Sequence, residues 1–223
     1  IPLDKFIVGY TGKLGVSNAI EFLIDSADKL QNHQDIIFVI VGRFVEAKGF
    51  IYLIKAFAKI DRNIRDKMNL ILVGDGVEKT ILEEAVLELG IKNDVIFLGY
   101  QDNPYKYMKE SDLFVLSSLW EGFGIVIIEA MVLNIPIVSS NCKYGPSEIL
   151  LDENKIEYGK LVNIEDDKEK YSDSLSTAII DLYIDPELRN KYNKLSMKRV
   201  SLFNIDNIIQ NYINLFNKSE NNE

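Results

Sequence analysis

Cysteine and histidine are almost absent from this chain of 223 residues, which contains one of each, Cys142 and His33. A single cysteine excludes an internal disulfide framework and any zinc site built from four cysteines. A single histidine excludes metal centres with several histidine ligands and argues against a histidine-based catalytic dyad. We expect Cys142 to be a small, partly buried residue and His33 to lie in an exposed loop.

The sequence also lacks a long apolar run and an excess of positive charge. Its longest apolar run, residues 36–41, is far shorter than the ~18 residues that a membrane-spanning helix needs. The N-terminus lacks the features of a signal peptide, so we expect a cytoplasmic, reducing environment. The formal net charge of −9 at pH 7 argues against nucleic-acid binding but does not exclude a local site for a phosphate group.

Short apolar segments alternate with helical patterns along the chain. We predict strands over residues 6–8, 36–41, 70–73, 95–98, 113–116, 135–139 and 160–162. Apolar residues recurring every three or four positions predict helices over 19–30, 50–60, 78–89, 105–109 and 125–133. Three more helices are predicted over 171–183, 186–202 and 204–217. This pattern indicates an α/β fold, a doubly wound parallel sheet of Rossmann-like type with its ligands at the carboxyl ends of the strands.

The beginning of the chain repeats the pattern that follows it. The segment that starts at Ile7 aligns with the segment that starts at Ile40, an offset of 33 residues, and each is predicted to form a strand, a glycine loop and a helix. Either a duplication or the common pattern of βα units explains this similarity. We therefore divide the chain into an extra βα unit over 1–35 and an α/β domain with C-terminal helices over 36–223.

The loop after the strand 36–41 carries two cations next to the start of a helix. Gly42 lets the backbone turn where a side chain would crowd a ligand, and Arg43 and Lys48 follow it. Two cations at the carboxyl end of a strand, beside a helix N-terminus, suit a diphosphate. The alternative is a solvated loop with ordinary surface charges.

Glycines also close the next two strands. In the segment VGDG, Gly74 permits a tight turn and Asp75 is placed to cap the next helix, whereas in LGYQDN a base could stack or bond to the backbone at Gly99. The dinucleotide fingerprint GxGxxG follows none of the predicted strands, which argues against an NAD enzyme. A plain structural turn is the alternative for each segment.

The segment LWEGFGIVIIEAM is the most informative in the chain. Gly122 and Gly124 flank Phe123 where a helix begins, so that bare backbone amides and the helix dipole can approach an anion. Glu121 precedes this helix and Glu129 lies on it, eight positions later. The two acids could bracket a ligand, with Glu121 at its reacting end and Glu129 on neutral hydroxyl groups. A paired-carboxylate hydrolase and a capping acid with a surface glutamate are the alternatives.

A fourth glycine loop follows the strand 135–139. In KYGPSEIL, Gly145 provides a turn and Pro146 suits the first position of a helix. The predicted strands thus end in glycine-containing loops that share one edge of the sheet. This convergence favours a ligand site over four separate connections.

Taken together, these motifs resemble the C-terminal domain of glycosyltransferase family 4 enzymes, which have the GT-B fold. The matching segments run in the order of the family over about 37–162 and include VGRFVEAKGF, LILVGDG, VIFLGY, SDLFVLSSLWEGFGIVIIEAM and IPIVSSNCKYGPSEIL. The E-x7-E motif of the family is present as Glu121 and Glu129. The segment GPSEIL resembles the branch that builds bacterial surface polysaccharides.

The resemblance implies roles for individual residues. In the family the Arg and Lys of the first loop bind the donor diphosphate, the first Glu contacts the donor sugar and the second Glu binds the ribose hydroxyls. The implied catalytic residues are Arg43, Lys48 and Glu121. The implied donor-binding residues are Gly42, Gly74, Gly99, Tyr100, Phe123, Gly124, Ile125 and Glu129.

The resemblance further implies a retaining glycosyltransferase that uses a nucleotide-diphosphate sugar, for which we expect UDP, and that needs no metal and no other cofactor. A hexosyl group would pass to a glycan or lipid-linked acceptor, in polysaccharide biosynthesis, and the full enzyme could associate peripherally with a membrane. The family's acceptor-binding N-terminal domain has no counterpart here, because residues 1–35 instead resemble the start of a second family 4 domain. The alternative is therefore a catalytically incomplete module that binds nucleotide sugars or a partner.

Overall fold

The computed structural model describes residues 36–220 of the chain and contains a six-stranded sheet. The predicted strand 6–8, the predicted helix 19–30, His33 and the boundary of the extra βα unit lie outside the described residues. The strands are β1 (Ile36–Val41), β2 (Met68–Val73), β3 (Val95–Gly99), β4 (Leu113–Leu116), β5 (Ile137–Ser140) and β6 (Lys160–Val162). The bounds of each lie within two residues of a predicted strand, because apolar residues that the sheet buries form most of each strand.

The sheet is doubly wound. All of its pairs are parallel, and the strand order is β3-β2-β1-β4-β5-β6. Connections run outward in one direction from β1 and in the other from β4, so the carboxyl ends of these two neighbours form the switch point of the topology. The predicted α/β, Rossmann-like fold is confirmed.

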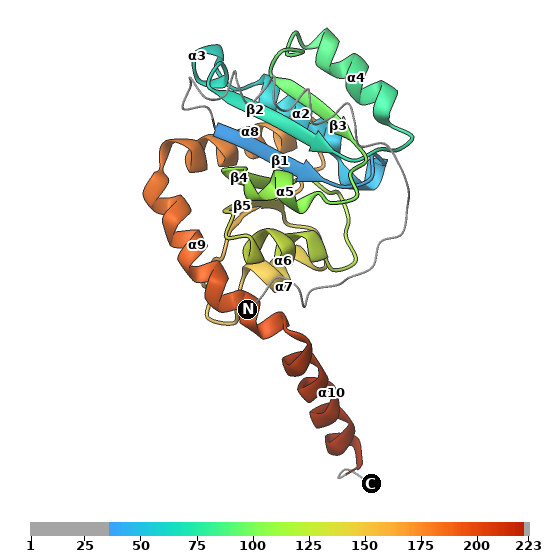
Figure 1. Cartoon of the computed structure of the whole chain (residues 1–223), viewed down its shortest axis with the longest axis vertical. Helices are drawn as coiled ribbons and strands as arrows, with labels where there is room; N and C mark the ends of the chain where they lie inside the picture. The colour runs from blue at the N-terminus through green and yellow to red at the C-terminus, as the bar shows by residue number, and fades with distance from the viewer. Residues whose placement is uncertain (1–35, 221–223) are drawn as a thin grey trace.

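Different helices cover the two faces of the sheet (Figure 1). Phe38 and Ile40 of β1 pack with α2 (Phe50–Ala58), α4 (Lys79–Glu88) and α8 (Lys168–Ile184), whereas Val39 between them packs with α5 (Tyr105–Lys109), α6 (Ile125–Val132) and α7 (Pro146–Leu150). This alternation follows from the opposite directions of successive side chains in a strand. It also explains why successive residues of β1 are apolar.

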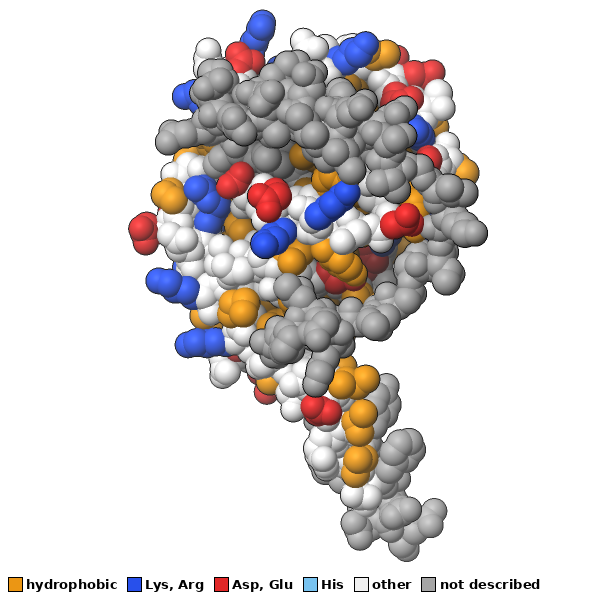
Figure 2. Space-filling model, in the orientation of Figure 1, with side chains coloured by type: hydrophobic (Ala, Val, Ile, Leu, Met, Phe, Trp, Pro, Cys, Tyr) orange, Lys and Arg blue, Asp and Glu red, His pale blue; other side chains and the backbone are white. Residues whose placement is uncertain are grey.

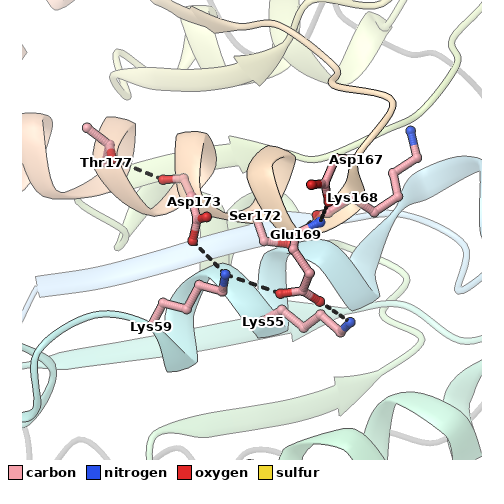
Figure 3. Close-up of polar contacts among 8 residues, drawn as sticks. All are labelled: Lys55, Lys59, Asp167, Lys168, Glu169, Ser172, Asp173 and Thr177. Carbon is pink, nitrogen blue, oxygen red and sulfur yellow. Dashed lines mark hydrogen bonds and ion pairs between the residues drawn. The ribbon is translucent and has the colours of Figure 1, made fainter.

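The contact between α2 and α8 is closed at its edge by ion pairs (Figure 3). Lys55 Nζ lies 2.7 Å from Glu169 Oε1, and Lys59 Nζ lies 3.2 Å from Glu169 Oε2 and 2.5 Å from Asp173 Oδ1. These side chains are 33–60% exposed, so solvent screens each pair and it contributes little to stability. Buried apolar contacts therefore provide most of the attachment of α8.

The remaining helices lead away from the sheet. After α9 (Pro186–Val200), which contacts α6, and the short turn η3 (Ser201–Phe203), α10 (Ile205–Glu220) extends beyond the rest of the domain (Figure 1). Figure 2 shows a row of hydrophobic side chains along α10. The exposed isoleucines of this helix include Ile205, Ile209 and Ile213. No helix among residues 36–220 is both long and apolar enough to cross a bilayer.

Three local features differ from the predictions. The helices α3 (Arg62–Arg65) and η2 (Glu46–Lys48) were not predicted, because each is a single turn with no apolar period. The predicted cap by Asp75 is wrong: its Oδ1 accepts from the neighbouring Gly76 N (2.8 Å), and α4 begins later, after Glu78. Cys142 is more buried than expected, with 2% of its surface exposed.

Candidate functional site

The loops after β1 and β4 meet at the switch point. Ser117 Oγ donates to the carbonyl oxygen of Lys48 (3.0 Å), and the amide of Leu119 donates to the carbonyl oxygen of Ala47 (2.9 Å). Gly49 adopts a left-handed conformation (φ 58°) beside them, and a Cβ there would lie 2.3 Å from the oxygen of Ser117. The two predicted site segments are therefore held against each other through their backbones.

Lys48 and Glu121 lie in direct contact although 73 residues separate them. Lys48 Nζ is 2.6 Å from Glu121 Oε1, and Ser118 Oγ donates to the same oxygen at 2.6 Å. The Glu121 side chain is 8% exposed and that of Lys48 is 23% exposed. The structure thus places one predicted acid beside one predicted cation in a largely buried contact.

Buried side chains support the backbone beneath this contact. The hydroxyl of Tyr171, on α8, donates to the carbonyl oxygen of Ser117 (3.0 Å), and Cys142 Sγ donates to that of Ser118 (3.1 Å). Burial raises the pKa of both groups, so that each stays protonated and able to donate. Sequence reasoning missed Ser117, Ser118 and Tyr171. Two serines at the end of an apolar strand were the available signal for the first two, and Tyr171 had none.

Arg43 differs from Lys48 in its surroundings. Arg43 is exposed, whereas the next residue, Phe44, is fully buried and anchors the loop. The amide of Phe44 donates to the carbonyl oxygen of Asp75 (2.9 Å). No ion pair among residues 36–220 includes Arg43. The guanidinium is therefore available to an external anion.

Close backbone approaches explain two of the glycines. Gly74 adopts φ 148°, and a Cβ there would lie 1.8 Å from the oxygen of Gly42, so the loops after β1 and β2 touch only because this residue has no side chain. A Cβ at Gly145 would lie 2.3 Å from the oxygen of Phe123. The loop after β5 thus supports the loop that precedes α6.

The start of α6 carries three of the predicted donor-binding residues. Gly124 is its N-cap, with φ 85°, and is buried, while Phe123 and Ile125 are 40% and 52% exposed. No side chain among residues 36–220 caps the first amides of this helix. Free amides at a helix N-terminus form a region of positive potential, which here lies next to the Lys48–Glu121 contact.

Glu129 lies one turn from the end of α6 and meets a residue that the sequence did not single out. The hydroxyl of Tyr105, the first residue of α5, donates to Glu129 Oε1 (2.9 Å). Burial raises the pKa of Glu129, and the hydrogen bond from Tyr105 opposes part of this effect. Burial and the neighbouring carboxylate raise the pKa of Tyr105 to about 12.

Gly99 and Tyr100 lie farther along the same edge. Gly99 ends β3, and its carbonyl oxygen accepts from the amide of Gly74 (2.9 Å). Tyr100 is 45% exposed. The structure therefore brings the ends of β1, β2, β3 and β4 to one edge, with the cations near β1 and the predicted base site two strands away.

A separate cavity of about 490 Å³ lies between α7 and α9. Carboxylates dominate its lining, which is formed by Glu148, Leu151, Asp152, Glu153, Asn154 and Arg199. Arg199 is occupied there, since its guanidinium donates to the backbone oxygens of Glu148 (2.8 Å) and Ile149 (3.1 Å). This cavity has the wrong charge for a diphosphate.

Comparison with known proteins identifies relatives of the chain. Residues 21–199 match the family model described as glycosyl transferases group 1. An uncharacterised glycosyltransferase of Methanocaldococcus jannaschii is 36% identical over 202 residues, which cover 79% of this chain and 48% of that protein. The N-acetylgalactosamine-N,N'-diacetylbacillosaminyl-diphospho-undecaprenol 4-alpha-N-acetylgalactosaminyltransferase of Campylobacter jejuni is 30% identical over 163 residues, which cover 73% of this chain and 41% of that protein.

A solved structure shows the same fold at low identity. The pneumococcal O-GlcNAc transferase GtfA, crystallised with UDP and GlcNAc, superposes with a TM-score of 0.70 at 16% identity, over 84% of this chain and 36% of that one. This agreement extends the fold assignment to a lobe of the GT-B type. The chain spans less than half the length of the two relatives matched by sequence.

Proposed function

The chain belongs to group 1 of the glycosyl transferases, and from this membership we propose that it forms the donor-binding lobe of a nucleotide-sugar-dependent glycosyltransferase. The observation that carries the proposal is the contact of Lys48 with Glu121 at the switch point of the sheet. The loop of Lys48 also carries the exposed Arg43, and α6 begins soon after Glu121. Two cations, a carboxylate and the first amides of a helix thus belong to two adjoining segments, where a diphosphate and its sugar would lie side by side.

Arg43, Lys48 and the amides at the start of α6 would bind the diphosphate. An ammonium group has three N–H donors, so Lys48 can keep one on Glu121 and offer others to a phosphate oxygen. Negative charge grows on the diphosphate as the bond between the sugar and its oxygen breaks. Cations and amides already in place stabilise this charge without reorganising, so we propose no metal and no other cofactor for the reaction.

The two glutamates would hold the two ends of the donor. Glu121 would contact the sugar, held in place by Lys48 and Ser118, and Glu129 would accept from the ribose hydroxyls. The base would lie at Gly99 and Tyr100, near the end of β3. We propose transfer with retention, in which the acceptor hydroxyl attacks the face that the diphosphate leaves and its proton passes to the departing phosphate oxygen.

The relatives support a finer proposal. The Campylobacter relative is named for the transfer of N-acetylgalactosamine to a diphospho-undecaprenol saccharide, and the pneumococcal structure contains UDP with GlcNAc. We therefore propose UDP as the nucleotide, a hexosyl group as the cargo and a glycan or lipid-linked acceptor, as in the assembly of surface polysaccharides. Arg43, Lys48 and Glu121 remain the proposed catalytic residues.

Calorimetric titration of the full chain with UDP, GDP and ADP tests the donor site. We expect at least one diphosphate to bind, and Arg43→Ala to weaken it by about 1.5–3 kcal/mol, the cost of a charge-assisted hydrogen bond, while the matching nucleoside is unaffected. Arg62→Ala is the matched control, because Arg62 is 84% exposed on α3 and lies away from the site. Failure of all three diphosphates to bind, or equal weakening of diphosphate and nucleoside, contradicts the proposal.

A second assay separates an enzyme from a binding module. Hydrolysis or transfer of a bound UDP-sugar by the full chain would establish turnover. A different result is that the chain binds the nucleotide without turnover by itself and gains turnover when an acceptor-binding lobe from a relative is added. That result would support a donor lobe that needs a second lobe. Binding without turnover under both conditions would favour the catalytically incomplete module.

A further inference from the structure

The hydrogen bond between Tyr105 and Glu129 joins the two sides of the proposed nucleoside site. Tyr105 begins α5, directly after the loop that follows β3, and Asn103 Oδ1 accepts from its backbone amide (3.2 Å). Glu129 lies on α6, 24 residues later in the sequence. The loop proposed to hold the base and the helix proposed to hold the ribose are thus connected by these two side chains.

The chemistry of this pair determines which atom donates the hydrogen bond and which accepts it. A carboxylate only accepts, so the phenol must be the donor in the 2.9 Å contact. The phenol oxygen keeps its own lone pairs and can accept a hydrogen bond from a third group. The pair therefore presents carboxylate and phenol acceptors together, and the phenol proton is already committed.

A ribose offers the complementary groups. Its neighbouring 2′ and 3′ hydroxyls can both donate, and they suit two acceptors held side by side. Tyr105 is 41% exposed, so a ligand can reach it, while the apolar neighbours of Glu129 on α6, Ala130 and Met131, are fully buried. Glu129 is therefore a half-buried residue in an apolar helix, and the hydrogen bond from Tyr105 holds its carboxylate in place.

We propose that Tyr105 is a positioning and specificity-determining residue that selects ribonucleotides, holding the Glu129 carboxylate in place and accepting one ribose hydroxyl on its phenol oxygen. This inference rests on the proposed nucleotide site and goes beyond it by assigning the second member of the ribose contact. Selection follows because a nucleotide without these hydroxyls leaves the acceptor pair unmatched. Losing a hydrogen bond to a charged, half-buried acceptor such as Glu129 weakens binding more than losing one to a fully solvated group.

The test compares two ligands on four proteins: the full-length wild type, Tyr105→Phe, Glu129→Gln and Tyr183→Phe. Whichever of UDP, GDP and ADP binds the wild type most tightly is titrated by calorimetry beside its 2′,3′-dideoxy form. We expect Tyr105→Phe to weaken the ribonucleotide by about five- to tenfold, the effect of one hydrogen bond, and to leave the dideoxy form within about twofold. Tyr183 lies near the end of α8, on none of the loops of the proposed site, so Tyr183→Phe should change neither affinity.

The double variant Tyr105→Phe/Glu129→Gln supplies a further readout. Because Tyr105 both holds Glu129 and contacts the ribose, the double variant should bind the ribonucleotide more weakly than Glu129→Gln alone, but by less than the two single effects combined. Equal weakening of both ligands, unchanged affinity of Tyr105→Phe, or fully additive effects would overturn the inference while leaving the nucleotide site intact. Absence of any nucleotide binding by the wild type would instead overturn the proposed function, and the inference with it.

Discussion

Replacing Lys48 by methionine should destabilise the protein far more than the same change at an exposed ion pair. Methionine keeps the aliphatic stem and removes the ammonium, which leaves Glu121, 8% exposed, with Ser118 as its remaining side-chain donor. Removing one partner of a fully buried pair costs about 3–5 kcal/mol, and the 23% exposure of the Lys48 side chain reduces the expected loss to about 2–3 kcal/mol. Lys160→Met is the control, because Lys160 and Asp181 are 37% and 40% exposed at 3.2 Å, a surface pair worth at most about 1 kcal/mol.

The same contact predicts an asymmetry between its two partners. Glu121→Gln leaves Lys48 unpaired, but the more exposed ammonium can reach water, so we expect a loss of only about 1 kcal/mol. The double variant Lys48→Met/Glu121→Gln should recover much of the loss caused by Lys48→Met alone, because no buried charge remains. Urea denaturation of the wild type and the four variants measures these differences. Equal losses for Lys48→Met and Lys160→Met, or a larger loss for Glu121→Gln, would refute the reasoning from burial.

Three further perturbations test other parts of the structure. Tyr171→Phe removes the donor to the carbonyl oxygen of Ser117 and should cost about 1–2 kcal/mol in urea denaturation, and an unchanged midpoint would show that this bond is not formed. Gly74→Ala should lower the free energy of unfolding by more than about 3 kcal/mol, because its Cβ would lie 1.8 Å from a backbone oxygen. Gly90→Ala, where φ is 68° and the space is open, should lower it by only about 1–2 kcal/mol. Similar losses for the two variants would contradict the close approach at Gly74. Glu129→Gln should raise the melting temperature at pH 7, because burial raises the folded-state pKa of Glu129 above its unfolded value and so penalises the charged form. Since protonation of Glu129 removes this penalty, the advantage of the variant should shrink as the pH falls through the raised pKa, and an advantage independent of pH would contradict this cause.

The strands could be predicted because burial on both faces of the sheet requires mostly apolar residues in them. The run 36–41 became β1 without change, and the helix predicted over 105–109 is α5. The predicted ends of a helix were wrong where a polar capping residue determines the first residue of the helix. Asp167 accepts from the amide of Glu169 and starts α8 at Lys168, three residues before the predicted helix, because an apolar period does not register a cap.

Motif spacing could place the site residues on their loops, but it could not supply the contacts between them. The sequence placed Lys48 and Glu121 near the ends of two strands, whereas their 2.6 Å contact depends on β1 and β4 being neighbours in the sheet. Tyr171 lies on α8, 54 positions after Ser117, and no local sequence pattern predicts a contact between residues so far apart in the chain. Tyr105 was overlooked for a similar reason, since its importance arises only from its position beside Glu129.

An NMR titration of the isotope-labelled chain with UDP tests most directly whether the carboxyl edge of the sheet binds a nucleoside diphosphate. We expect amide shifts to concentrate at the ends of β1, β3 and β4 and in the loops after them, residues 42–49, 99–105 and 117–125, while the amides around the cavity between α7 and α9 stay unchanged. Shifts confined to that cavity or to α10, or no shifts at millimolar UDP, would contradict binding at this edge.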